Sequence, residues 1–84
     1  MTYAVNFSKH AFHDLEKIQE PYYTRIKQAI RNLAHTPRPA GCKKLQGIHS
    51  YRIRVGRYRV IYDVIDRQLV ITVIAIGDRK DVYR

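Results

Sequence analysis

Three closely spaced arginines, Arg52, Arg54 and Arg59, carry the most distinctive chemistry in this sequence. A guanidinium group stays charged at physiological pH and presents a rigid fork of donors that matches the oxygens of a phosphate. Such groups can clamp a phosphodiester and stabilise the extra charge of its transition state. They suit a passive phosphate-binding surface equally well. The arginines alone therefore predict either a nuclease site or a binding site.

Residues 51–62 are expected to form a β-hairpin that places these arginines on one face. Apolar residues alternate with arginine there, which is the period of a strand with two unlike faces. Gly56 and Arg57 suit a two-residue type II′ turn, and this register sets Arg54 opposite Arg59. Two like charges in that position repel, so we expect an anion between them. The core face would then hold Tyr51, Ile53, Val55, Tyr58, Val60 and Tyr62.

The other elements predict one small α+β domain, residues 1–84, with the element order β-α-α-β-β-β. Residues 2–7 alternate as a first strand, and Ser8 is a good N-cap for the helix that follows. The buried stripe of this helix would contain Ala11, Phe12, Leu15 and Ile18. Pro21 separates it from a second helix. The two helices should form a hairpin packed on a mainly antiparallel, four-stranded sheet.

Two further stretches complete the expected sheet. Residues 35–47 contain prolines and glycines and are predicted to form a loop. Residues 69–76 are apolar and β-branched at almost every position, which is typical of a central strand covered on both faces.

The chain carries 16 Lys and Arg residues against 7 Asp and Glu, a formal net charge of +9. This excess predicts fast, salt-dependent association with polyanions. Nucleic acid, a ribosome, a membrane surface or an acidic protein would fit, as would a merely solubilising surface. The sequence shows no secretory signal and no apolar run long enough to span a membrane, so a cytoplasmic location is expected.

Few other side chains could do chemistry. Cys42 is the single cysteine, which excludes an internal disulfide and a paired-cysteine zinc site. His10 and His13 are expected on the surface of the first helix, and His49 in a loop before the hairpin. The acidic residues form no spaced pair of the kind that hydrolyses glycosides. Neither a metal nor a cofactor is expected.

Three stretches of the sequence resemble the RelE branch of the RelE/ParE toxin superfamily: residues 44–47, the hairpin 51–62 and the ending 76–83. The similarity extends over essentially the whole chain. It implies a compact, microbial-ribonuclease-like fold and the toxin of a type II toxin–antitoxin system. RelE toxins are metal-independent endoribonucleases that enter the ribosomal A site and cleave mRNA there. The resemblance therefore implies inhibition of translation.

The resemblance also implies roles for individual residues. The ribose 2′-oxygen would attack its adjacent phosphate, leaving a cyclic phosphate and a free 5′-hydroxyl. Arg59 and Arg79 would hold the phosphate and its developing charge, and Tyr83 would orient the nucleotide. Further contacts with RNA are expected from Lys43, Lys44, Arg57 and Lys80.

This sequence departs from the family at two positions. Arg52 and Arg54 stand where relatives carry lysines, and an arginine hardly acts as a base. Both are therefore expected to stabilise charge and to lower the pKa of the 2′-hydroxyl. Tyr83 and His49 remain the candidates for the general base.

As partners, the resemblance implies an acidic antitoxin, in a heterotetramer or a larger complex, together with the ribosome and mRNA. Operator DNA would be bound only through the antitoxin, and no membrane is involved. Two alternatives stay open. One is a ParE-like poison of DNA gyrase without nuclease activity, and the other is a catalytically inactive basic module that binds RNA or protein. All three share one fold, so the fold alone does not choose among them.

Overall fold

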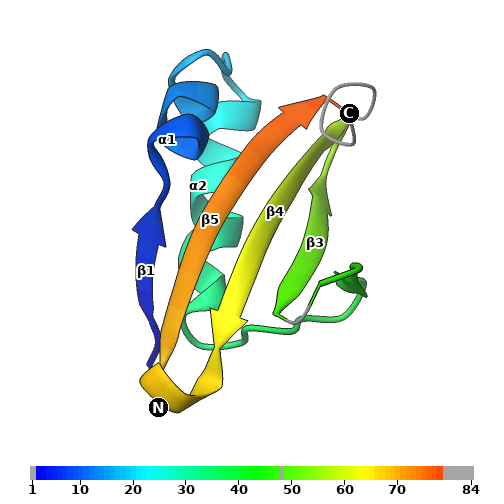
Figure 1. The fold of residues 1–84 in the computed structure, drawn as a ribbon. Coiled ribbons are helices and arrows are strands. Elements are labelled where there is room, and N and C mark those ends of the chain that lie inside the picture. The colour runs from blue at the N-terminus through cyan, green and yellow to red at the C-terminus, as the bar shows by residue number, and fades with distance from the viewer. Residues whose placement is uncertain (1, 48, 79–84) are drawn as a thin grey trace.

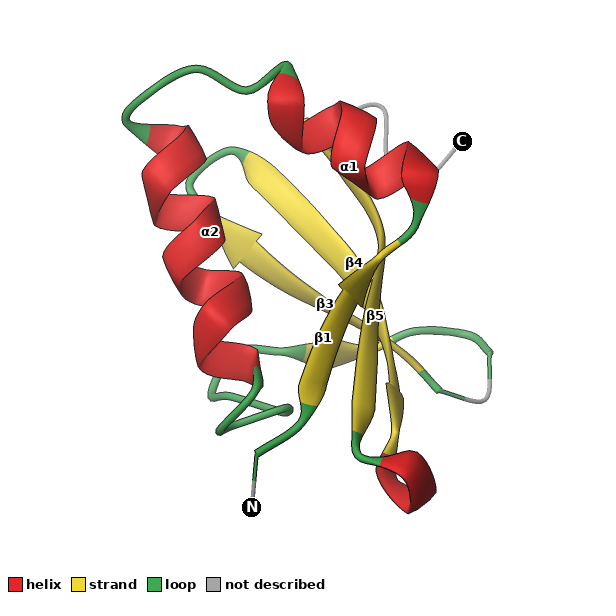
Figure 2. Ribbon diagram, turned by 90° about the vertical axis from the view of Figure 1, so that its left-hand side faces the viewer, coloured by secondary structure: helices red, strands yellow, loops and turns green. Residues whose placement is uncertain are grey.

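The computed structural model describes residues 2–47 and 49–78. Two helices, α1 (Lys9–Glu16) and α2 (Tyr22–Leu33), pack on one face of a five-stranded sheet (Figure 1, Figure 2). The strands are β1 (Ala4–Phe7), β2 (Lys43–Lys44), β3 (Ser50–Val55), β4 (Tyr58–Ile65) and β5 (Val70–Asp78), and the 3-10 turn η1 (Asp66–Gln68) joins the last two. The strand order is β1-β5-β4-β3-β2. Among the strands of the described residues, only β1 and β5 are parallel neighbours, so the expected α+β fold is confirmed.

The additional strand, β2, lies in the stretch that the sequence predicts as a loop. Lys43 pairs with Arg52 and Lys44 with Tyr51, so β2 adds a short edge beside the first half of β3. A two-residue strand is too short to show a period in sequence, which explains the difference from the expected four strands. Its consequence is that Lys43 lies next to Arg52.

The arginine-bearing hairpin has the register expected from its sequence. Arg54 is the Cα partner of Arg59, and Val55 that of Tyr58. Gly56 has a φ of +60° and Arg57 does not have a positive φ, which is the combination of a type II′ turn. The ring of Tyr22, at the start of α2, lies directly against the position that a Cβ on Gly56 would take. The turn is therefore fixed by its backbone and by its contact with the helix.

The N-cap of α1 is confirmed and also ties this helix to the sheet. Ser8 Oγ accepts a hydrogen bond from the backbone N–H of Ala11 at 3.0 Å and donates one to the carbonyl of Ile74 at 2.9 Å. The expected burial of Phe12 is wrong, because its side chain is 53% exposed. Each residue turns an α-helix by about 100°, so burying Ala11 carries Phe12 towards the margin of the covered face.

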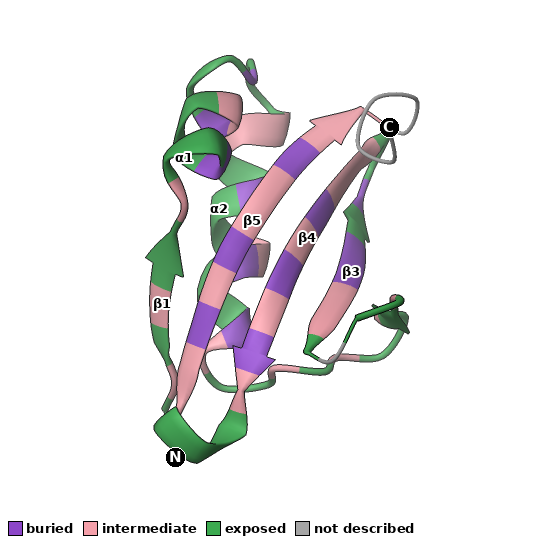
Figure 3. Cartoon of the chain, viewed as in Figure 1, coloured by how far each residue is buried: buried purple, intermediate pink, exposed green. Residues whose placement is uncertain are grey.

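The core lies between the helices and the sheet. Its buried members are Ala11, Leu15, Ile18, Ile26, Ile30, Leu33, Ile53, Val55, Val60, Tyr62, Val64, Ile71, Val73 and Ile76. β5 has a neighbouring strand on each side, as expected, but the expectation that both its faces are covered is wrong. Ile71, Val73 and Ile76 are buried against the helices, whereas the residues between them are half-buried (Figure 3). The open face of the sheet is thus available for a site.

One polar network closes the end of the sheet that carries η1. Arg38 Nη2 lies 2.7 Å from Asp66 Oδ2, and Arg38 Nε donates to Tyr51 Oη at 3.0 Å. Tyr3 Oη also donates to Asp66. The network joins the N-terminal segment, the loop after α2, β3 and the turn before β5. Hydrogen bonds from Arg38 and then Tyr3 hold the pKa of Asp66 below its ordinary value.

We predict that Gly56→Ala destabilises the protein by about 1–3 kcal/mol, because the left-handed backbone and the Tyr22 ring both oppose a methyl group there. Urea unfolding of the purified chain measures this. Gly41→Ala is the matched control: Gly41 also has a positive φ, but a Cβ there meets no atom within 4 Å. An equal loss in both variants would show that the contact with Tyr22 contributes nothing.

We predict that Asp66→Asn lowers the melting temperature at neutral pH and that this difference disappears in acid. The pKa of Asp66 is depressed in the fold, so its stabilising contribution is present above the unfolded-state pKa and is lost as the pH falls below about 4. Melting curves of both proteins between neutral pH and pH of about 3 measure it. In acid, Arg38→Gln should lose the part of its effect that depends on pH, since it removes the main donor to Asp66, and keep the part that comes from the lost hydrogen bond to Tyr51. A difference between Asp66→Asn and the wild type that persists at the lowest pH would contradict this.

Candidate functional site

Four cationic side chains meet on the face of the sheet that the helices leave open. Residues paired directly across neighbouring strands share a face. One cross-strand row therefore consists of Lys43, Arg52, Ile61 and Ala75, and the next of Arg54, Arg59 and Gly77. Two residues along a strand advance by about 7 Å, so the two rows are close neighbours. We call Lys43, Arg52, Arg54 and Arg59 the arginine face.

Arg52 is the unusual member of the arginine face. It is only 6% exposed, and it is the one charged residue that is buried in the described part of the chain. Its Nε atom is enclosed and has no hydrogen-bond partner among residues 2–47 and 49–78. An arginine cannot lose its proton to relieve this burial. A buried charge without a counter-charge is costly, so the site is built to receive an anion.

The row beside Arg52 supplies the rest of a phosphate cradle. Arg54 is exposed and lies directly across from Arg59, which is half-buried. The β5 partner of Arg59 is Gly77, and that of Ile61 in the neighbouring row is Ala75. These two positions carry no bulky side chain on the arginine face. Among the described residues, small side chains therefore border the arginine face on its β5 side.

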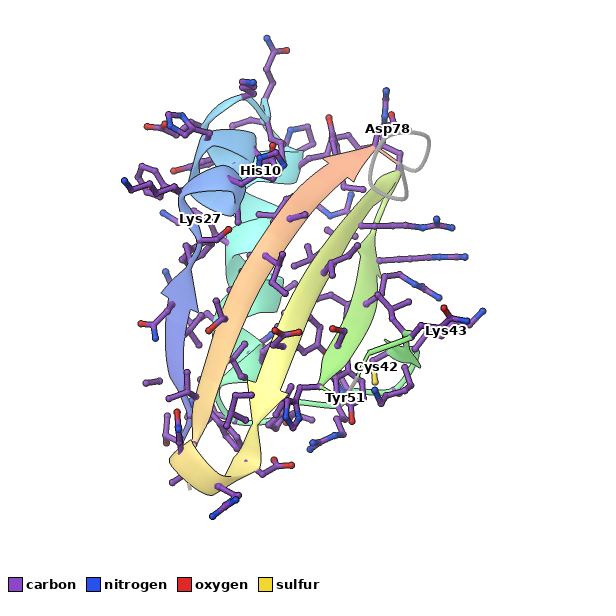
Figure 4. All side chains as sticks on the ribbon, in the orientation of Figure 1. His10, Lys27, Cys42, Lys43, Tyr51 and Asp78 are labelled. Atoms are coloured by element: carbon purple, nitrogen blue, oxygen red, sulfur yellow. The ribbon has the colours of Figure 1, made fainter. Side chains whose placement is uncertain are left out.

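One carboxylate lies on this face beyond the arginines, and another lies at the hairpin end on the opposite face. Asp63 accepts a hydrogen bond from Ser50 Oγ at 2.8 Å, beyond the rows that hold the arginines. Asp78 accepts from Arg57 Nε at 2.8 Å at the hairpin end, and this contact raises the pKa of Arg57. Figure 4 shows Asp78 at the far end of β5 and Lys43 beyond the edge of β3. The centre of the arginine face is strongly positive.

The two lysines of β2 have different surroundings. Lys43 shares the face of Arg52, as its pairing requires. Lys44 points the other way: its ammonium group lies 5.2 Å from the centre of the Tyr51 ring and donates to the carbonyls of Leu45 and Gly47. Of the two expected RNA contacts, the structure brings Lys43 to the arginine face and leaves Lys44 outside it.

The candidate bases and the C-terminal residues stand apart. His49 is exposed, as expected, and precedes β3 by one residue. It lies five strand positions before Arg54, about 17 Å along the chain, so it is not brought together with the Arg54–Arg59 pair. Arg79, Lys80 and Tyr83 lie outside the described residues.

Two features of the site were not foreseen from the sequence. The burial of Arg52 was not expected, and neither was its pairing with Lys43 of β2, which no sequence period reveals. The small residues Ala75 and Gly77 are visible in the sequence, but their place beside Ile61 and Arg59 requires the strand register. Among the described residues, no group of His, Cys, Asp and Glu is placed to hold a metal, and no helix there is long and apolar enough to cross a membrane.

Comparison with known proteins identifies the fold. The model of the family described as the ParE toxin of the type II toxin-antitoxin system, parDE, matches residues 5–83. A RelE-like toxin protein of Escherichia coli is 35% identical over 92 residues, which cover 99% of this chain and 92% of that protein. The mRNA interferase toxin RelE of Escherichia coli (strain K12) is 28% identical over 88 residues, which cover 99% of this chain and 92% of that protein.

Solved structures agree with the sequence matches. The archaeal RelE–RelB complex from Pyrococcus horikoshii OT3 superposes with a TM-score of 0.85 at 31% identity, covering 98% of this chain and 100% of the matched one. The isolated Escherichia coli RelE toxin superposes with a TM-score of 0.79 at 29% identity, and the match covers 96% of this chain and 90% of that one. This chain therefore belongs to the RelE/ParE superfamily of type II toxins, on its RelE branch.

Proposed function

We propose that this protein is the toxin of a type II toxin–antitoxin pair and cleaves mRNA in the ribosomal A site, which inhibits translation. The observation that carries the proposal is the buried, permanently charged Arg52 next to the opposed pair Arg54 and Arg59. These three residues suit a phosphodiester better than a protein surface, because guanidinium forks match its oxygens. The E. coli relative is named an mRNA interferase, which agrees with this chemistry.

The reaction requires no metal in this proposal. The 2′-oxygen of a ribose attacks the adjacent phosphorus, the bond to the 5′-oxygen breaks, and a cyclic phosphate and a 5′-hydroxyl result. Arg54 and Arg59 bind the non-bridging oxygens as negative charge develops on them. Arg52, with its charge in a poorly solvated position, lowers the pKa of the 2′-hydroxyl.

Several parts of the proposal rest on the resemblance. Arg79 would add a further contact to the phosphate, and Tyr83 would orient the nucleotide. Lys43 extends the arginine face along the RNA, and Lys44, Arg57 and Lys80 would contact RNA outside it. The ribosome supplies much of the positioning, which would explain why the described residues contain no pair of acid and base beside the arginines.

The proposed partners follow from the same family and from charge. Relatives of this chain were solved as complexes of RelE with RelB, and an acidic antitoxin would be attracted by a net charge of +9. We propose a heterotetramer or larger complex that contacts operator DNA only through the antitoxin. Binding to a ribosome places the toxin in the cytoplasm.

The matched family model carries the ParE name, which keeps gyrase poisoning as a second candidate. A poison that acts by binding a protein has no need of a buried arginine aimed at an anion. The two candidates differ in what they break: one leaves mRNA cut within codons, and the other leaves damaged DNA with intact mRNA.

We predict that Arg59→Ala lowers the rate of mRNA cleavage by about 100-fold or more, because it removes a donor to the transition-state charge. Purified toxin is added to ribosomes stalled on a defined message, and primer extension counts the cuts with and without ribosomes. Arg67→Ala is the matched control, since Arg67 is an exposed arginine in η1, away from the arginine face.

Cleavage that survives in Arg59→Ala at the rate of Arg67→Ala would contradict the site assignment. Uncut mRNA together with a DNA-damage response after induction of the wild type would favour the gyrase candidate.

A further inference from the structure

A recess of about 410 Å³ lies at the edge of the sheet between α2 and β3. It exists because β2 accompanies β3 only as far as Arg52, and the preceding chain then turns away towards α2. In Figure 1, β3 forms the margin of the sheet along its upper part, and the loop after α2 approaches only its lower end. No strand in the described residues lies beside the outer edge of Ile53–Val55.

The walls of the recess combine apolar surface with a polar rim. Leu33, Pro39 and Ile53 supply apolar surface, and the side chains of Asn32 and Thr36 stand at the rim. Leu33 and Ile53 are buried, whereas Asn32 and Thr36 are exposed. A flat heteroaromatic ring between apolar groups, with an amide and a hydroxyl at its edge, is the arrangement that proteins use for an unstacked nucleobase.

The recess lies on the helix side of the β3 edge, and the arginine face lies on the other side of that edge. Arg54 lines the recess and is also the cross-strand partner of Arg59. Neighbouring strands are about 5 Å apart, so a phosphate held by Arg54 and Arg59 lies about one strand width from the edge where the recess opens. RNA bound at the arginine face therefore meets this opening as it passes over β3.

We propose that this recess is a nucleobase-binding site that receives one base of the nucleotides flanking the scissile phosphate. The proposal deepens, and rests on, the proposed RNA-cleaving function. The base crosses the edge of β3 and lies against Pro39 and Ile53, while the amide of Asn32 reads its polar edge. An asparagine amide offers one donor and one acceptor to the polar edge of an unpaired base. The recess thereby sets which codons are cut.

The binding test uses deoxynucleoside 3′-monophosphates as probes, because they lack the attacking 2′-oxygen. Amide NMR spectra of the toxin are recorded with each of the four bases and with inorganic phosphate. We expect shifts at Gly41 and Ile53 that differ among the four bases, and shifts confined to the arginine face with inorganic phosphate. Ala40→Leu, in which an exposed loop residue fills the recess, should abolish the base-dependent shifts and keep those caused by phosphate.

The specificity test compares cleavage positions. The 5′ ends produced on ribosomes are sequenced. Asn32→Ala and Ala40→Leu should change the proportions of cut codons by about ten-fold, which is the discrimination that one contact with a base provides. Total cleavage by Asn32→Ala should fall less than that of Arg59→Ala. Ala4→Leu is the matched control, an exposed alanine on β1 outside the recess.

Each negative result has a distinct meaning. Absence of base-dependent shifts at Gly41 and Ile53 overturns the proposal, as do unchanged codon proportions in both recess variants. Protection of the recess by an antitoxin peptide with no effect of any nucleotide also overturns it and assigns the recess to a protein partner. If the protein shows base-dependent shifts but cuts no mRNA, the recess is a base-binding site and the proposed RNA-cleaving function is wrong.

Discussion

Arg52 carries a permanent charge, and the fold keeps this residue only 6% exposed, on the face of the sheet away from the helices. Burial of a charge without a partner opposes folding, and the described residues give its Nε no acceptor. The rest of the sheet must therefore supply enough stability to hold it. A site that carries this strain in the free protein is already organised for the anion that relieves it, which is the arrangement that electrostatic catalysis requires.

Several elements of the fold position Arg52 and the arginines beside it. The type II′ turn at Gly56, closed against Tyr22, fixes the register that sets Arg54 against Arg59. β2 flanks Arg52 on the outer side, and the small residues of β5 leave room on the inner side. The helices pack only on the other face, so the core and the site share a sheet without competing for the same surface. The early departure of β2 from β3 leaves the recess open at the β3 edge, where Arg54 lines it.

The strand period and the turn residues were enough to predict the hairpin, its register and the shared face of its arginines, because each rests on local geometry. Other features depend on contacts between distant residues. The pairing of Lys43 with Arg52, the exposure of Phe12 and the single covered face of β5 follow from how the elements pack. The roles expected for Arg79 and Tyr83 rest on resemblance alone, since both residues lie outside the described part of the chain.

If Arg52 is held in a strained position until an anion binds, the melting temperature of Arg52→Met in chloride and in sulfate at equal ionic strength will show it. The variant should melt above the wild type in chloride, by about 4–8 °C for each kcal/mol of relieved strain. Sulfate should then raise the melting temperature of the wild type more than that of Arg52→Met. The melting temperature of the control, Arg67→Met, should rise as much as that of the wild type. A variant that melts below the wild type in chloride, or a sulfate effect equal in all three proteins, would contradict it.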